Sequence, residues 1–481
     1  MATHFAEPIP ARLLMWQRVR HYAVPPSMIE NAAARRAAGD WAGACAAARI
    51  DVDLDLRAVR DRHGTDLTAR LRADLRRLAP DLLRWNMPRI APDGRLRPGL
   101  TLSLAHYGVP GTAAPQLVVR TPPAWADAGQ RMSLTLYEES RDGAPEHHPH
   151  PHPDRRFRLD LHRHLWDATR SAELAQRCGA GALYRPADGD RSWPPDHWAD
   201  EAERLLQADG RPRGALTVRL GTRSHIVLEL VAPDDSHAPV LRPVREVLPP
   251  QQVAALPMLP EAAARTPPDV ELVRAGLVRV ERLHPLVAAA LSAPELADAV
   301  SDATVVPGLG NLADESAAPG PADHHRVECL GSVHRIALRN GTLTAVDHDA
   351  AQLAREELLM ALGGPGLPCL RAIDTVHRSP EALPAVRERL GHGDVIGALD
   401  VVEELLGPGA VLREGPLREA LEAAVTGRLV HGLFRSGLVS VHPAAATTWG
   451  VSHRPRLDRR LPRELLRKRG SRARPRNGLH S

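Results

Sequence analysis

The chain has 481 residues, of which 43% are apolar and 25% charged, the balance of an ordinary soluble globular protein long enough for several domains. Its one lysine, Lys468, lies close to the end of the sequence. A Walker-A phosphate loop, the conserved lysine of protein kinases and a pyridoxal-phosphate Schiff base all need a lysine in the folded body, so these three chemistries are disfavoured.

Residues 1–92 are predicted to form a helical region. The sequence Ser27-Met28-Ile29-Glu30 has the pattern of a capping box, which predicts a helix running to about Ala38. Gly39 can end that helix in the left-handed conformation, and Asp40 can cap the amides of the next helix. We therefore expect an αα-hairpin with a Gly-Asp turn, in which Trp41 offers a large side chain to a partner.

The same turn recurs near the other end of the chain. "GDWAGA" at residues 39–44 returns as "GDVIGA" at residues 393–398, where Asp394 takes the capping position. Locally this pattern resembles the junction between the helices of tetratricopeptide repeats. The two copies stand too far apart for a tandem array of ~34-residue repeats, so we expect two separate helical hairpins.

Residues 93–240 are predicted to form an antiparallel β-rich region with one intervening helix. Apolar and polar residues alternate in "LTLSLA", "QLVVRT", "MSLTLY" and "RFRLDL", and residues 214–232 have the pattern of a β-hairpin. Helical periodicity appears once, in "DHWADEAERLL". This alternation is typical of strands with one buried face.

The remaining sequence divides into three segments. Residues 241–325 are a Pro/Ala-rich helical segment and linker, and residues 326–453 are expected to be an α+β region with a type I′ β-hairpin at Asn340-Gly341. Residues 454–481 hold eleven basic residues against two acidic ones, which predicts a basic, disordered tail. The fold class predicted for the chain is α+β, with helical regions at both ends flanking antiparallel sheets.

A histidine-rich stretch is the most conspicuous candidate for chemistry. It lies between residues 147 and 164, and its last two histidines, His162 and His164, would point the same way on a strand. Proline alternates with histidine at the start of the stretch, which favours a polar loop whose rings are not held in place. His162 and His164 are weak candidates for metal ligands or catalytic residues, and we expect no bound metal or cofactor.

Two further candidates are weaker. Asp347 and His348 precede a helix, where an acid could orient a histidine base, although Asp349 has the commoner role of an N-cap. The four cysteines are widely spaced, without a C-x-x-C pair, which favours buried reduced thiols. Cys178 could be an activated thiol only if His162 or His164 came near it.

The predicted function is noncatalytic binding of an unidentified protein partner in the cytoplasm, through the hairpins marked by Asp40, Trp41 and Asp394. One alternative is a metal-dependent or hydrolase-like enzyme that uses the central histidines and aspartates. The other is association with nucleic acid through the basic tail. No membrane segment is expected, because the sequence holds no long apolar run.

Overall fold

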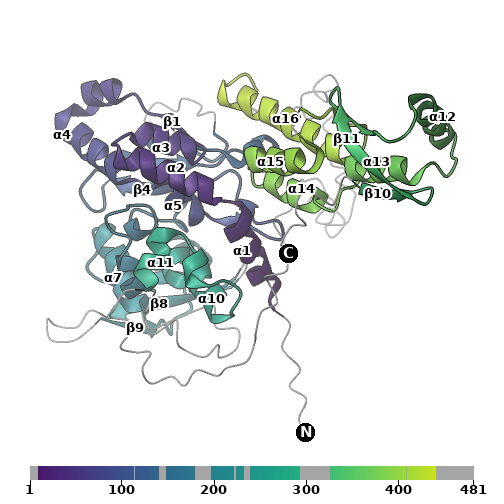
Figure 1. The fold of residues 1–481 in the computed structure, drawn as a ribbon. Helices are drawn as coiled ribbons and strands as arrows, with labels where there is room; N and C mark the ends of the chain where they lie inside the picture. Colours follow the sequence, from purple (N-terminus) through teal and green to yellow (C-terminus); the bar gives the residue numbers. More distant parts are fainter. Residues whose placement is uncertain are drawn as a thin grey trace, which may run out of the picture. The chain divides into compact units, whose positions relative to one another are not determined.

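The computed structural model describes residues 9–112, 114–139, 148–178, 197–221, 224–231, 239–292, 326–407 and 409–439 (Figure 1). These residues belong to two compact units. Unit 1 takes residues 1–303 and 433–481, and unit 2 takes residues 304–432. The fold is α+β, as predicted, with helices towards both ends of the described chain and sheets between them.

Unit 1 begins with three helices, α1 (Ala11–Tyr22), α2 (Pro26–Ala37) and α3 (Trp41–Ala47). The capping box predicted at Ser27 is wrong. Helix α2 already begins at Pro26, and its N-cap residue, Pro25, makes no side-chain capping bond. Proline fits the first turn of a helix because its φ is fixed and it has no N–H to satisfy, so proline starts this helix.

The Gly-Asp turn between α2 and α3 is confirmed, and so is its second copy. Gly39 and Gly393 have φ of 77° and 81°, the left-handed conformation that glycine tolerates. The Gly43 amide donates to Asp40 Oδ1 at 2.8 Å, and Asp394 accepts the equivalent bond from a backbone amide at 3.3 Å. The φ and ψ angles of the two aspartates agree within 1°.

The turn involves more of the sequence than the Gly-Asp pair. Arg35 Nη1 donates to Asp40 Oδ2 at 2.9 Å, and Arg389 makes the same contact with Asp394 at 2.9 Å. A Cβ atom at Gly43 would lie 1.9 Å from the Asp40 carboxylate, so this glycine leaves room for the ion pair. The repeated motif is therefore Arg-x3-Gly-Asp-x2-Gly-Ala, once in each unit.

The largest sheet of unit 1 has four strands in the order β1-β6-β5-β4. Their bounds are Ile50–Asp53 for β1, Thr101–His106 for β4, Gln116–Arg120 for β5 and Met132–Tyr137 for β6. Neighbouring strands are antiparallel except β1 and β6, which are parallel. Residue Asp55, just after β1, caps helix α4 (Leu56–Arg77) by accepting from the amides of Arg57 and Ala58.

The strand predicted in "RFRLDL", residues 156–161, is not formed. This segment makes one isolated parallel bridge to β4, between Arg158 and Ser103. Within it, Arg156 pairs with Asp154, and Arg158 pairs with Asp160, two residues away in each case. These local ion pairs hold the segment in turns along the edge of β4. Its alternating apolar residues are therefore not part of a ladder of backbone hydrogen bonds.

Further elements complete unit 1. Helices α5 (Pro80–Trp85), α6 (Glu173–Arg177), α10 (Pro268–Arg274) and α11 (Pro285–Leu291) contribute to the main core, together with the short β2 (Arg89–Ile90) and β3 (Arg95–Leu96). A separate core lies between a second sheet and two helices: β7 (Gly214–Arg219), β8 (His225–Val231), β9 (Val240–Pro243), α7 (Trp198–Ala208) and α9 (Glu261–Ala264). Helix α8 (Pro250–Ala255) precedes α9.

Unit 2 contains a three-stranded antiparallel meander, β10 (Arg326–Cys329), β11 (Ser332–Arg339) and β12 (Thr342–Ala345). The turn at Asn340-Gly341 has positive φ at both residues, as predicted for a type I′ turn. Its helices follow in chain order: α12 (Ala350–Ala361), α13 (Pro368–Arg378), α14 (Leu383–Gly391), α15 (Val395–Leu406) and α16 (Pro416–Arg435). In the described parts of the chain, no helix is long and apolar enough to cross a membrane.

Candidate functional site

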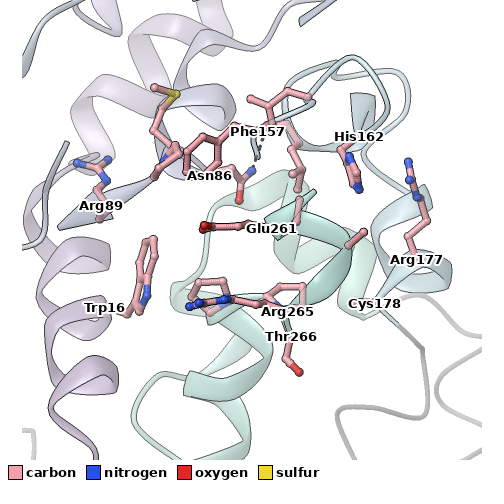
Figure 2. Close-up of a pocket in the computed structure, with 18 of the residues that line it drawn as sticks. Trp16, Asn86, Arg89, Phe157, His162, Arg177, Cys178, Glu261, Arg265 and Thr266 are labelled. Carbon is pink, nitrogen blue, oxygen red and sulfur yellow. Dashed lines mark hydrogen bonds between the residues drawn. The ribbon is translucent and has the colours of Figure 1, made fainter. Parts of the chain in front are cut away.

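A pocket of about 340 Å³ in unit 1 gathers most of the buried polar side chains that the fold leaves facing a cavity (Figure 2). Its volume falls at the lower end of the range of small-molecule sites. Two glutamates, Glu201 and Glu261, line it, and so do seven arginines: Arg12, Arg20, Arg89, Arg97, Arg177, Arg219 and Arg265. The wall is therefore strongly cationic.

Helix α1 supplies one side of the pocket. Arg12, Trp16 and Arg20 are spaced four residues apart, so they share one helical face. Arg20 lies between two indole rings, 5.0 Å from the centroid of Trp16 and 4.3 Å from that of Trp85. It is also fixed by a hydrogen bond from Nε to Asp269 on α10, at 2.5 Å. The aromatic wall at Trp16 is thus rigidly placed.

Arg89 is the most unusual residue of the pocket. Its side chain is buried, and only Nη2 is used, donating to the Arg84 carbonyl at 2.8 Å. Among the described residues neither Nε nor Nη1 of Arg89 has a hydrogen-bond partner. Burial, together with the charge of Arg20, lowers the pKa of Arg89 from 12.5 to about 9, so it stays cationic at neutral pH at an energetic cost.

Arg89 is not alone in this respect. Nη2 of Arg20 and Nε of Arg97 are also buried, and neither finds an acceptor within the described parts of the chain. The pKa of Arg97 is lowered, first by burial and then by the charge of Arg156. Buried N–H groups are almost always paired in folded proteins, because an unpaired one costs about 1–3 kcal/mol. Several residues that line the pocket therefore carry buried donor atoms without a partner among the described residues.

The opposite side of the pocket holds the histidines singled out in the sequence. His162 and His164 are both buried, with ring centroids 5.8 Å apart. Nδ1 of His162 donates to the Arg158 carbonyl at 2.9 Å, and its Nε2 lies 3.3 Å from Glu201 on α7. Figure 2 shows His162, Arg177 and Cys178 on the side away from Trp16 and Arg89, with Glu261 between them.

Glu201 is the centre of an ion-pair cluster at this end. It accepts from both Arg177, on α6, and Arg204, one turn further along α7. Burial alone would raise the pKa of Glu201, but hydrogen bonds and charges from His162 and Arg177 outweigh burial and hold it below its ordinary value of 4.5. Glu201 is therefore ionised and already fully engaged.

Neither Cys178 nor His164 is activated for catalysis. Burial raises the pKa of Cys178 from 9.0 to about 11, so the thiol keeps its proton at neutral pH. His164 has a pKa well below 6.5, because it is buried and because His162 and Arg177 lie beside it. The cationic neighbour that would turn Cys178 into a thiolate is thus not provided by this histidine.

The other histidines of the histidine-rich stretch do not lie in an open loop where the structure describes them. His148 is buried, and its two ring nitrogens face the carbonyls of Thr121 and His150, both at 2.9 Å. His152 Nδ1 lies 2.7 Å from the hydroxyl of Tyr137. His147 lies outside the described residues. These contacts fix the rings individually and direct them to different partners.

The remaining sequence candidates lie in unit 2 or in the hairpins. Asp347 is paired with Arg335, whose hydrogen bonds lower the pKa of Asp347 from 3.8 to about 2. His348 instead lies against His334, with 2.7 Å between Nε2 and Nδ1. Trp41 is half-buried and packs against the core of unit 1. Asp347 and His348 therefore have different partners and do not act as a pair.

The sequence reasoning missed the arginines of the pocket. They come from six separate parts of unit 1, and arginine is the common cation of this chain, so no local pattern marks them. The spacing of Arg12, Trp16 and Arg20 is the only local signal. No protein-family model, curated protein or solved structure matches the chain.

Proposed function

We propose that unit 1 binds a small organic anion in the arginine-lined pocket and does not convert it chemically. The observation that carries this proposal is Arg89, a buried cation that lines the pocket and whose Nε and Nη1 have no hydrogen-bond partner among the described residues. A phosphate or carboxylate group can accept from such a guanidinium in a bidentate manner. The apolar part of the ligand would lie against Trp16 and Phe157, which line the same cavity.

A binding role is favoured over catalysis by how the polar groups are used. Glu201 and His162 are engaged with each other, and the Cys178 thiol is protonated. Arg177 likewise donates hydrogen bonds to Glu201 and to the carbonyl of Leu161. Among the described residues, the pocket atoms without a hydrogen-bond partner are mainly arginine nitrogens, together with Nε2 of His162, and donors of this kind suit recognition of negative charge.

The proposal predicts that Arg89→Met abolishes anion binding without weakening the fold. Calorimetric titration of the full chain with inorganic phosphate, phenyl phosphate and benzoate is the direct measurement. Loss of a charge-assisted hydrogen bond worth about 1.5–3 kcal/mol should weaken phenyl phosphate binding by ten- to more than a hundredfold. In the absence of anion the variant should melt close to the wild type, because removal of a buried charge offsets the loss of the hydrogen bond to the Arg84 carbonyl.

Arg60→Met is the matched control, since Arg60 is exposed and pairs only with its neighbour Asp61 among the described residues. It should bind the three probes as the wild type does. Phenyl phosphate should bind more tightly than inorganic phosphate, because Trp16 and Phe157 contact its ring. Equal binding by wild type and Arg89→Met would refute the site, and so would a wild type that binds none of the probes.

Protein docking at the helical hairpins, predicted from the sequence, is a second candidate. In the second hairpin Ile396 and Leu399 are 76% and 43% exposed on α15. Ile396→Asp should leave the melting curve unchanged and release any protein that co-purifies with the chain. Retention of that protein by the variant would end this hypothesis for α15. The nucleic-acid hypothesis stays a prediction, because residues 454–481 lie outside the described residues.

A further inference from the structure

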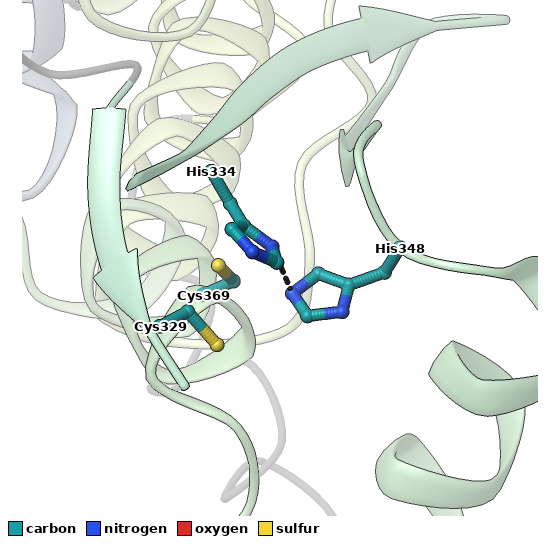
Figure 3. Close-up of side chains that lie close together, drawn as sticks. All are labelled: Cys329, His334, His348 and Cys369. Atoms are coloured by element: carbon teal, nitrogen blue, oxygen red, sulfur yellow. Dashed lines mark hydrogen bonds between the residues drawn. The ribbon is translucent and has the colours of Figure 1, made fainter. Parts of the chain in front are cut away.

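Two cysteines and two histidines of unit 2 meet at one point, although they are spread over 41 residues of sequence (Figure 3). They are Cys329, His334, His348 and Cys369, and one ligand atom of each lies within 4.8 Å of those of the other three. Both cysteines are buried and both histidines are half-buried. We propose that this cluster, Cys329/His334/His348/Cys369, is a structural zinc site.

The donor set and the spacing fit zinc. Structural zinc sites take four ligands from cysteine and histidine in a tetrahedron, with bonds of about 2.3 Å to sulfur and about 2.0–2.1 Å to nitrogen. Neighbouring donor atoms in such a tetrahedron are roughly 3.3–3.8 Å apart. With separations of at most 4.8 Å here, closing the shell asks for movements of roughly 1 Å.

Each ligand is presented by a different part of the fold. Cys329 ends β10, and His334 lies two residues beyond its strand partner Ser332, so both side chains are on the same face of the hairpin. Cys369 is in the first turn of α13. A single ion would therefore join the sheet of unit 2 to its central helix.

His348 is held in position through its neighbour. The carboxylate of Asp347 accepts from the backbone N–H of Arg335 at 2.8 Å and from its guanidinium at 2.8 Å. This fastens the segment after β12 to β11, and His348 then turns its ring to His334, as Figure 3 shows. The ion pair of Asp347 thus orients a ligand, which explains an aspartate and a histidine side by side.

The backbone next to Cys329 gives an independent indication. Leu330 and Gly331 form the two-residue turn between β10 and β11, and both have positive φ, 55° and 80°. The other turn of the meander uses Asn340-Gly341 in the same conformation, with the residue that usually fills this position. A leucine there is strained, and such strain persists where surrounding contacts fix the chain. Ligation of Cys329 would supply such a contact.

Unit 2 also has a reason to need a metal. Residues 304–432 include no phenylalanine, tyrosine or tryptophan, so its core is built from small aliphatic side chains and the two cysteines. A structural zinc ion contributes directly to folding stability and would tie this core to the sheet. The proposal departs from the sequence expectation of no bound metal, which rested on the histidine-rich stretch, where nothing fixes the rings in a coordination geometry.

Elemental analysis of the full chain, purified under reducing conditions and dialysed, should find one zinc per chain. Cys329→Ser and Cys369→Ser should each lose it, whereas Cys45→Ser and Cys178→Ser, which alter buried thiols of unit 1, should keep it. After zinc is replaced by Co²⁺, the wild type should show the strong visible bands of tetrahedral cobalt and a sulfur-to-cobalt charge-transfer band. His348→Cys should retain the metal with a stronger charge-transfer band, because a third thiolate joins the shell.

Stability provides a readout that does not depend on the variants folding. Six of the eight tryptophans lie in the described part of unit 1 and residues 304–432 hold none, so tryptophan fluorescence does not report the melting of unit 2. A chelator should lower the melting temperature of unit 2, followed by helical circular dichroism. It should leave the fluorescence transition unchanged. Absence of zinc and of cobalt bands in the reduced wild type would overturn the proposal, as would a Cys329–Cys369 disulfide in its place.

Discussion

Arg84→Met is expected to lower the free energy of unfolding of unit 1 by about 3–5 kcal/mol. Arg84 is a residue of α5 and is completely buried, at 0% exposure. Its guanidinium donates to the backbone carbonyls of Gln130 at 2.6 Å and Ala23 at 3.2 Å. These two acceptors lie on segments far apart in the sequence, so the side chain joins them.

The cost arises from what the variant leaves behind. Methionine fills much of the volume, but the two carbonyls lose their donor in a place that water does not reach, at about 1–3 kcal/mol each. Removal of the charge offsets part of this, because burial and the neighbouring arginines hold the pKa of Arg84 well below 12.5. The net effect is a loss because the carbonyls stay buried.

Urea unfolding followed by tryptophan fluorescence measures this effect, since it monitors unit 1. Arg60→Met removes the same charge from the surface and should change the free energy of unfolding by less than about 0.5 kcal/mol. If Arg84→Met unfolds at the wild-type urea concentration, the buried carbonyls do not depend on Arg84 and its role as a link between segments is wrong.

Local patterns in the sequence predicted the turns and caps well. Asp40, Asp55 and Asp349 cap helices through bonds to amides two or three residues ahead, and this information lies entirely within a few positions. The Asn340-Gly341 turn is equally local. The contact between His334 and His348 shows the limit of local patterns. His348 was a candidate from the sequence, but strand pairing brings its partner His334 to it.

The site residues could not be predicted because long-range packing assembles them. Cys329 and Cys369 lack the short spacing that marks a zinc ribbon, and only the contact of β10 with α13 brings them together. Arg89 looks like any other arginine until the fold buries it without an acid nearby. At residues 156–161 the alternation of apolar and polar residues predicted a strand, which is not formed. Ion pairs between residues two apart hold this segment instead.

Glu201→Gln is expected to cost about 3–5 kcal/mol of the stability of unit 1 at pH 7, because removing the acid from a buried cluster leaves its cations without a counter-charge. The side chain of Arg177 is less than one-tenth exposed, so water does not compensate its charge. Glu173→Gln is the control: its pair with Arg170 lies at the surface and should be worth less than about 1 kcal/mol.

The pH dependence separates charge from packing in this variant. The pKa of Glu201 is lower in the folded protein than its ordinary value of 4.5, so its contribution to stability is present above that pH and is lost as the pH falls further. The difference in free energy of unfolding between wild type and Glu201→Gln should therefore be constant from pH 7 to about 5 and shrink below 4.5. A difference that stays constant down to pH 3 would mean that glutamine fails through its shape, and that the ion pairs with Arg177 and His162 contribute nothing.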